Sequence, residues 1–242
     1  MKVLKTILYH KGFDSAVAES LELLQADCQN LIISPSDANV LVCARTNKKL
    51  NKIVSQFYWN LPDGMPSVWM LKLKGAKDAT RISGYAFFEE LMKRTATTSA
   101  QHFLCGGDVG VAEKLKAVCQ KWGNNNVCGT LSPPYKDELN NFEIKEIAEE
   151  INKQNTTVLW VGLGAPKQLY FAHEIAKYTK AKLIVTIGAA FDFHAGTVQK
   201  APSWIESSGM EWFYRLLKEP ARLSKRYFKV VPKFIFYSIL DR

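Results

Sequence analysis

Apolar residues along the chain are grouped in short runs that alternate with segments of helical periodicity. Helical periodicity is clearest in residues 108–122 and 142–154, where apolar side chains recur on one face. We expect the short runs to form buried parallel strands because they are apolar throughout and rich in β-branched residues. These runs are 30–34, 56–61, 102–107, 157–164 and 182–191. The alternation predicts an α/β fold with a doubly wound, mostly parallel sheet.

The pattern changes after Phe191. Residues 201–242 contain helical segments, prolines that include Pro202 and Pro220, and no convincing strand before an apolar end. We therefore expect a main body over residues 1–200 and a C-terminal helical appendage over 201–242. No Gly/Ser-rich linker separates the two, which indicates that the appendage packs on the body.

Charge is unevenly distributed along the chain. The 242 residues are 47% hydrophobic and carry a net charge of +9, and the segment from Trp212 to Arg242 contributes eight basic and two acidic side chains, 8 − 2 = +6. Aromatic residues are interleaved with these cations. Basic-aromatic segments are typical of proteins that lie on an anionic membrane surface. We expect the appendage to contact the membrane.

Cysteine spacing and hydropathy exclude several classes of protein. The five cysteines are scattered without a C-x-x-C motif, so neither a disulfide framework nor a zinc site is expected. No apolar run has signal-peptide length or approaches the ~20 residues of a membrane-spanning helix. The sequence thus predicts a cytoplasmic protein, peripheral on the inner face of the plasma membrane.

Polar residues that follow the expected strands are the functional candidates, because ligands of doubly wound folds bind beyond the carboxyl ends of the strands. Asp63, in the sequence QFYWNLPDGM, follows one of them. A carboxylate there can remove the proton of a sugar hydroxyl. The alternative is a structural turn or helix-capping aspartate, because P-D-G is a common turn sequence.

A second candidate is the sequence VGLGAPKQ, in which Gly162 and Gly164 follow a strand and a helix is expected to begin near Pro166. The backbone N–H groups at such a helix start can bind a phosphate. Lys167 and Gln168 add a cation and an amide. A single G-x-G is weak evidence for nucleotide binding on its own.

Two further segments complete the candidate site. In IGAAFDFHAG, Asp192 can bind ribose or base groups, or else only tie down its own loop, and we interpret His194 as a satisfied polar residue. In the appendage, basic side chains can stabilise a diphosphate leaving group, or else form a solvated or lipid-facing surface. These are Arg215, Arg222, Lys225 and Arg226. The chain has no D-x-D sequence, which favours a site without a metal ion and with no other cofactor.

Six segments taken in order resemble the WecG/TagA/CpsF family of glycosyltransferases, also called glycosyltransferase family 26. They are PDGM, LCGG, LSPPY, VGLGAPKQ, GAAFDFHAGTVQKAP and GMEWFYRLLKEPARLSKRY. The resemblance runs from about Ser34 to about Tyr227. It implies a Rossmann-like catalytic domain and an appendage that reaches the membrane and helps complete the active site. It also implies an inverting enzyme that moves a sugar from a UDP-sugar to a polyprenyl-diphosphate-linked saccharide in bacterial cell-surface polysaccharide synthesis.

Residue roles follow from the same resemblance, position by position. Asp63 matches the catalytic base, and Ser34 stands near it where the family has another polar group. The remaining matches are assigned to binding of the nucleotide sugar. They are Gly162, Gly164, Lys167, Gln168, Asp192, Tyr135, Arg215, Arg222 and Lys225.

Several positions depart from the family pattern and suggest a diverged branch. Leu169 stands where an acidic residue usually follows P-K-Q, Lys200 replaces an arginine, and Tyr85 interrupts a G-S-D-like segment. The departures at Ser34 and Leu169 make a catalytically lapsed membrane scaffold an alternative. The basic charge alone also suggests a nucleic-acid-binding protein, which we consider a weaker alternative. The transferred sugar and the formation of a homo-oligomer stay open.

Overall fold

The computed structural model describes residues 1–134, 136, 139–202, 204–205 and 209–241, apart from the side chain of Arg222. Its strands are β1 (Lys2–Val3), β2 (Thr6–Ile7), β3 (Leu31–Ser36), β4 (Trp59–Pro62), β5 (His102–Gly106), β6 (Val127–Leu131), β7 (Val158–Gly162) and β8 (Leu183–Thr186). Its helices are α1 (Phe13–Gln25), α2 (Ala38–Thr46), α3 (Lys48–Val54), α4 (Met65–Leu73), α5 (Gly84–Arg94), α6 (Val111–Lys121), α7 (Asn141–Lys153), α8 (Lys167–Ile175), α9 (Ala190–His194), α11 (Glu211–Lys218) and α12 (Pro220–Leu240).

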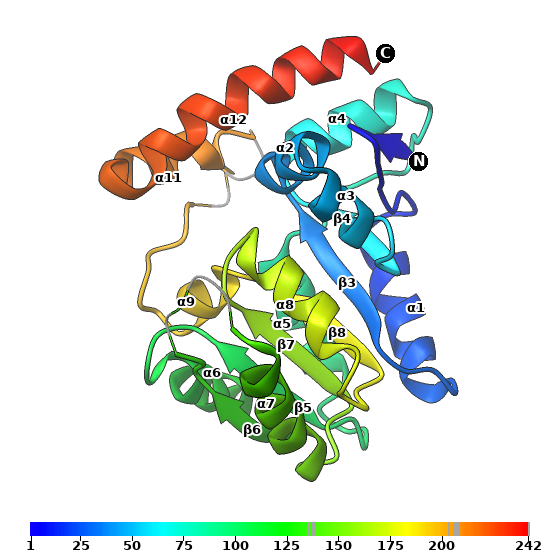
Figure 1. The fold of residues 1–242 in the computed structure, drawn as a ribbon, viewed down its shortest axis with the longest axis vertical. Helices are drawn as coiled ribbons and strands as arrows, with labels where there is room; N and C mark the ends of the chain where they lie inside the picture. Colours follow the sequence, from blue (N-terminus) through cyan, green and yellow to red (C-terminus); the bar gives the residue numbers. More distant parts are fainter. Residues whose placement is uncertain (135, 137–138, 203, 206–208, 242) are drawn as a thin grey trace.

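The centre of the molecule is a six-stranded sheet with the order β4-β3-β8-β7-β5-β6, in which every pairing is parallel (Figure 1). Strands β5, β7 and β8 are almost entirely buried, as expected of strands that are covered on both faces. The prediction of a doubly wound, Rossmann-like α/β fold is therefore confirmed. A short antiparallel pair, β1 and β2, lies apart from this sheet.

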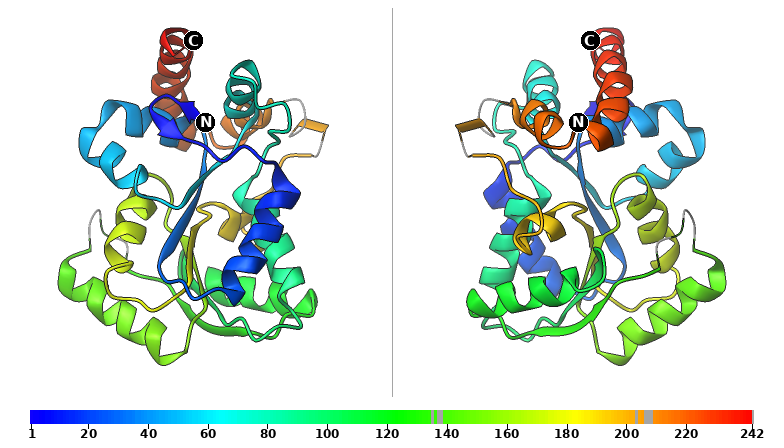
Figure 2. Two further views of the ribbon diagram at one scale, coloured as in Figure 1. Left: turned by 90° about the vertical axis from the view of Figure 1, so that its right-hand side faces the viewer. Right: turned by 90° about the vertical axis from the view of Figure 1, so that its left-hand side faces the viewer.

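Two layers of helices cover the sheet (Figure 2). One apolar cluster joins α1, α5, α6 and α9 to one face, and a second joins α2, α3, α7 and α8 to the other. A third, smaller cluster lies beyond the sheet and combines the β1–β2 pair with α2, α4 and α12. Since each central strand has buried residues in both of the large clusters, the sheet is the core of the protein.

The sequence predicted five of the six strands of the main sheet and missed β6. Only the first residue of β6 is buried, and its sequence VCGTL lacks a continuous apolar run. The expected strand at 182–191 ends at Thr186, where a turn leads into α9. The predicted helices at 108–122 and 142–154 are α6 and α7.

Residues 211–240 form two helices that lie across the end of the molecule where α2 and α4 are found (Figure 1). Helix α12 contains Pro232 and buries Val230 and Phe234 in the third apolar cluster. Its C-terminal end is held by Asp241, whose Oδ2 accepts a hydrogen bond from the Leu4 backbone N–H at 2.9 Å and lies 3.6 Å from Lys74 Nζ. Among the described helices, none has the length and hydropathy needed to cross a membrane.

Candidate active site

A large cavity of about 1250 Å³ opens at the carboxyl ends of the strands. Residues that directly follow all six strands of the main sheet line it: Asp37 after β3, Asp63 after β4, Gly107 after β5, Ser132 after β6, Leu163 after β7 and Ile187 after β8. Helices α4, α11 and α12 form its outer wall. The cavity therefore lies where ligands bind in doubly wound folds, and the C-terminal segment encloses it.

Asp63 lies at one edge of this cavity, between the end of β4 and the start of α4. Its backbone N–H donates to the carbonyl oxygen of Ser36 at 3.3 Å, which extends the pairing of β3 and β4 by one residue. The Asp63 side chain is 25% exposed, and its Oδ1 lies 3.4 Å from Arg81 Nε and 3.5 Å from Arg81 Nη2. The N-cap residue of α4 is Gly64, and this helix has no side-chain cap. The Asp63 carboxylate lines the cavity and is a quarter exposed, so a ligand can reach it.

Burial raises the pKa of Asp63 from 3.8 to about 6. The Arg81 guanidinium and the backbone N–H of Gly84 oppose this increase, whereas the negative charges of Glu211 and Asp37 add to it. A carboxyl with a pKa near neutrality is ionised at pH 7 and still holds a proton strongly enough to act as a general base.

Glu211, in the first turn of α11, forms an ion pair with Nη2 of the same Arg81 that contacts Asp63. One guanidinium thus lies between two carboxylates, one from the sheet and one from the appendage. The side chains of all three residues are at least three-quarters buried. Sequence reasoning missed this pair because Arg81 and Glu211 are 130 positions apart.

We expect Glu211→Gln to move the acidic limb of the pH–rate profile of kcat/KM to lower pH. The wild-type limb should bend near pH 6, where Asp63 loses its proton. Removing the Glu211 charge lowers the pKa of Asp63, so the Asp63 carboxylate is ionised in more acidic solution. Glu219→Gln removes the same charge from the appendage outside the cavity and is the control. A limb that stays in place in Glu211→Gln would contradict the coupling.

Helix α8 points its N-terminal end toward the cavity, after the turn that follows β7. Gly164 has φ +73°, and no atom lies within 4 Å of the position that a Cβ would take, so a ligand can approach the backbone there. Gln168 is only 4% exposed, and its Oε1 has no hydrogen-bond partner among the described residues. This oxygen faces Gly188 after β8, where a Cβ would lie 3.3 Å away. Lys167 lines the same wall.

Gly162 has a packing role that the sequence did not reveal. A Cβ on Gly162 would come 2.5 Å from the ring of Phe191, and a Cβ on Gly106 would come 2.5 Å from the carbonyl oxygen of Gly162. Both distances are far below van der Waals contact. The absence of side chains lets β5, β7 and α9 meet at the floor of the cavity, which Gly162 lines, and the Phe191 ring occupies the space that a side chain at position 162 would take.

Asp192 lines the cavity from α9, and its loop is held locally. Its backbone carbonyl accepts hydrogen bonds from the Thr197 N–H at 3.0 Å and the Thr197 hydroxyl at 3.1 Å.

His194 stacks on Tyr85 with ring centroids 3.7 Å apart, and its Nε2 lies 3.0 Å from the Tyr85 carbonyl oxygen. Burial lowers the pKa of His194 to about 4, so the ring is neutral. His194 is a satisfied polar residue, as predicted, and Lys200 lies over the Tyr85 ring at 3.9 Å.

Two arginines bring positive charge into the cavity from the appendage. Arg215 on α11 lies over the Phe193 ring at 5.2 Å, and Arg226 on α12 lies over the Tyr227 ring at 5.0 Å. Within the described part of the chain, neither Nε has a hydrogen-bond partner and neither guanidinium forms an ion pair. Partly buried guanidinium groups without an anion are suited to bind one.

The structure corrects or leaves out three other predicted residues of the appendage and its surroundings. Lys225 is exposed and does not line the cavity, whereas its neighbour Arg226 does. Successive side chains of a helix such as α12 are turned by about 100° around the helix axis, so only one of the two can face inward. Tyr135 and the side chain of Arg222 lie outside the described residues. Across the described ranges, no group of three or more His, Cys, Asp or Glu side chains could hold a metal ion.

Ser34, predicted to act beside Asp63, lies inside the sheet instead. It is fully buried in β3, and its Oγ accepts a hydrogen bond from the Thr186 hydroxyl of β8 at 2.9 Å. It does not line the cavity. The period of two along a strand turns alternate side chains to opposite faces, so a residue near the end of β3 can still face the core. Asp37, the side-chain cap of α2, lines the cavity at this place.

Comparison with known proteins places this site in a family. The model of the glycosyl transferase WecG/TagA/CpsF family matches residues 1–242. An N-acetylglucosaminyldiphosphoundecaprenol N-acetyl-beta-D-mannosaminyltransferase of Bacillus spizizenii is 30% identical over 193 residues, 79% of this chain and 72% of the relative. The protein of the same name from Bacillus subtilis is 29% identical over 195 residues, 79% of this chain and 73% of the relative. The chain belongs to the WecG/TagA/CpsF family of glycosyltransferases.

Proposed function

We propose that the protein transfers a sugar from a UDP-sugar to a polyprenyl-diphosphate-linked saccharide, with inversion at the anomeric carbon. One observation carries this proposal: a carboxylate with a pKa near neutrality shares a cavity with a helix N-terminus and two arginines that have no anionic partner among the described residues. A base and a diphosphate site are the two parts that such a reaction needs.

In the proposed mechanism, Asp63 accepts the proton of the acceptor hydroxyl while its oxygen attacks the anomeric carbon of the donor. The new C–O bond forms on the face opposite the bond that breaks, so a single displacement inverts the configuration. The electron pair of the broken bond leaves on the diphosphate of UDP. Lys167, Arg215 and Arg226 stabilise this developing charge, and the protein cations serve in place of a metal ion.

The names of the two Bacillus relatives support the acceptor class. Both proteins are named for transfer of N-acetylmannosamine to N-acetylglucosaminyldiphosphoundecaprenol, a sugar joined to a polyprenol through a diphosphate. We infer a polyprenyl-diphosphate saccharide as the acceptor of this chain. N-acetylmannosamine is the first donor sugar to test, and cell-surface polysaccharide synthesis is the corresponding process.

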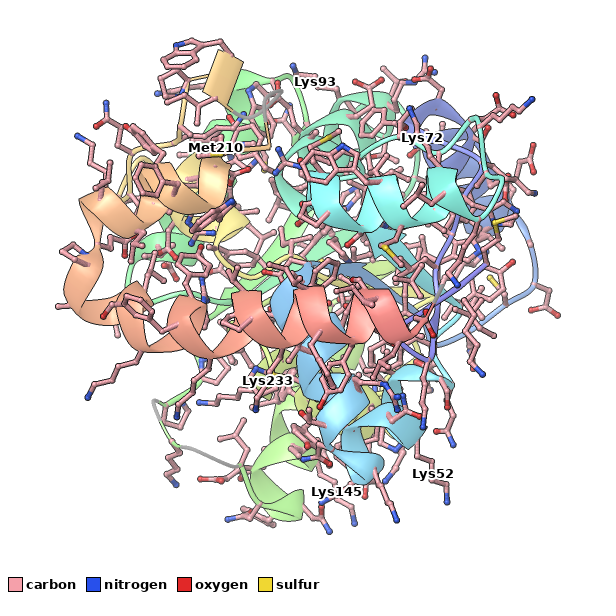
Figure 3. The ribbon with its side chains drawn as sticks, turned by 90° about the horizontal axis from the view of Figure 1, so that it is seen from above. Lys52, Lys72, Lys93, Lys145, Met210 and Lys233 are labelled. Carbon is pink, nitrogen blue, oxygen red and sulfur yellow. The ribbon has the colours of Figure 1, made fainter. Side chains whose placement is uncertain are left out.

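We also propose that the protein binds the membrane surface through the appendage. Figure 3, a view onto this end of the molecule, shows α12 crossing it beside α4, with Lys233 on α12. Large apolar side chains on α11 and α12 are exposed next to basic side chains. This combination is expected at a lipid headgroup layer. Among them are Phe213, Leu217, Phe228, Phe236 and Leu240.

A transfer assay tests the function. We expect purified protein to release UDP from a UDP-sugar only when a polyprenyl-diphosphate N-acetylglucosamine is present, and to form a product with the opposite anomeric configuration. Glycosidic linkage in the product is read by nuclear magnetic resonance. No UDP release from any UDP-sugar in a panel would favour a scaffold without catalysis. Tight and steeply salt-dependent binding to oligonucleotides would favour a nucleic-acid-binding protein instead.

A further inference from the structure

The cavity continues beyond the candidate active site as an apolar groove between α4 and α12. Trp69 and Leu73 line it from α4, and Val231, Ile235 and Ile239 line it from α12. We call this part the α4–α12 groove. The mechanism above uses none of these side chains, so the groove calls for a separate explanation.

The groove starts at the catalytic carboxylate. Helix α4 begins two residues after Asp63, with Gly64 between them, and therefore leads directly away from the base. At the other end, Lys74 follows α4 and pairs with Asp241, which follows the last residue of α12. Both helices thus run from the active site toward the same polar contact, and they lie side by side in the view of Figure 3.

The groove has an exposed apolar lining. Its lining residues on α12 extend from Val231 to Ile239, which is about 12 Å at 1.5 Å per residue. The side chains of Trp69, Leu73, Ile235 and Ile239 are all more than half exposed. Leaving this much apolar surface in water costs roughly 25 cal/mol per Å². An extended apolar chain would remove that cost.

The chemistry of the cavity changes in a definite order along this path. The carboxylate of Asp63 comes first, and the guanidinium of Arg226, which donates to the Tyr227 hydroxyl, lies near the start of α12. From Val230 to Ile235 only apolar side chains of α12 line the cavity. A saccharide on a polyprenyl diphosphate has the same order: a reacting hydroxyl, an anionic diphosphate and an isoprenoid chain. The match in order and the continuity with the active site identify one occupant.

We propose that the α4–α12 groove binds the diphosphate-proximal isoprene units of the acceptor, so that the protein recognises the lipid as well as the sugar. This inference rests on the proposed function and adds a lipid subsite to it. The tail lies along the exposed side chains of both helices and leaves the groove on the side that faces the membrane.

Two pairs of neighbouring residues on α12 give matched variants. Ile235 and Phe236 are 55% and 58% exposed, and Ile239 and Leu240 are 62% and 63% exposed, but only Ile235 and Ile239 line the cavity. The groove variant is therefore Ile235→Asn with Ile239→Asn. The control variant is Phe236→Asn with Leu240→Asn, which removes similar apolar surface from the same helix outside the groove.

Binding of soluble isoprenoid diphosphates tests the proposal without a membrane. We expect wild-type protein to bind farnesyl diphosphate at least tenfold more tightly than dimethylallyl diphosphate, as measured by calorimetry. The groove variant should lose this preference and the control variant should keep it. Leu73→Asn, on the opposite wall, should weaken the preference in the same direction. Thermal unfolding confirms that each variant is folded.

Several results would overturn the lipid subsite. One is equal affinity of the wild-type protein for farnesyl and dimethylallyl diphosphate. Another is an equal loss of the preference for farnesyl diphosphate in the groove and control variants, because that would indicate general adsorption of apolar chains to α12. Transfer assays separate this failure from that of the function. If the wild-type protein transfers sugar with the same KM to N-acetylglucosamine on farnesyl diphosphate and on dimethylallyl diphosphate, the proposed lipid subsite is refuted and the proposed function stands. If the groove binds farnesyl diphosphate and no sugar is transferred, the function is wrong.

Discussion

Asp63→Asn should lower kcat by a factor of about 10² to 10⁴, the usual contribution of a positioned general base. Asparagine keeps the size of the side chain and can still accept a hydrogen bond from Arg81, but its amide cannot take the proton of the acceptor hydroxyl. Binding of UDP should be unchanged, because the diphosphate site that we propose is built from other residues. The measurements are steady-state UDP release and calorimetric binding of UDP.

Stability provides the control for this variant. Because burial raises the folded-state pKa of Asp63 to about 6, the ionised carboxylate opposes folding, and stability decreases as the pH rises from about 4 through 6. The neutral amide lacks this penalty. Asp63→Asn should therefore unfold at pH 8 at a temperature no lower than that of wild type. Turnover close to the wild-type rate in the folded variant would refute the assignment of Asp63 as the base.

Arg226→Gln should reduce kcat/KM by roughly a hundredfold, the effect expected when one fixed cationic donor to a developing negative charge is removed. Arg226 lines the cavity, and its Nε has no hydrogen-bond partner in the part of the chain that the structure describes. Its Nη2 donates to the neutral Tyr227 hydroxyl at 3.3 Å, so no described carboxylate neutralises its charge, which stays available to an anion. The loss should be larger in kcat than in KM, because the diphosphate gains charge as the glycosidic bond breaks.

Lys225→Gln is the matched control, since it removes the same charge at the adjacent position of α12. Because Lys225 is exposed and outside the cavity, kcat/KM of the Lys225→Gln variant with a soluble acceptor should stay within about twofold of wild type. Equal losses in the two variants would show that the appendage acts through its total charge. A loss in Lys225→Gln alone would restore the assignment made from the sequence.

The central sheet could be predicted because its strands are buried on both faces and therefore read as continuous apolar runs. The run VLWVG of β7 is the clearest of these. β6 escaped because it is an edge strand with a largely half-exposed surface, where the sequence no longer has to be apolar. The two-residue strands β1 and β2 are too short to produce any pattern.

The candidate site was predictable where it follows from topology and not where it depends on side-chain direction. Asp63, Gly164, Gln168 and Asp192 follow parallel strands, and the carboxyl ends of parallel strands meet at one edge, so the fold brings them to one cavity. The direction of the Ser34 side chain could not be predicted in this way, because a shift of one residue along β3 moves a side chain to the opposite face of the sheet.

The arginines of the appendage and the partner of Arg81 were harder still. Choosing between Lys225 and Arg226 requires the rotation of α12 about its own axis, which depends on its packing against α2 and the third apolar cluster. The ion pair of Arg81 with Glu211 requires the position of a whole helix relative to the sheet. Neither is encoded in a local spacing.

The order of the elements along the chain has a consequence for how the enzyme matures. All six strands of the main sheet precede α11 and α12, so the ribosome completes the body of the protein before it makes the part of the cavity wall that these two helices form. A nascent chain that has folded its sheet exposes Asp63 and the start of α8 to water, with neither Arg215 nor Arg226 in place. In the mechanism that we propose, catalytic competence thus arrives only with the C-terminal helices, together with the surface that we propose to bind the membrane.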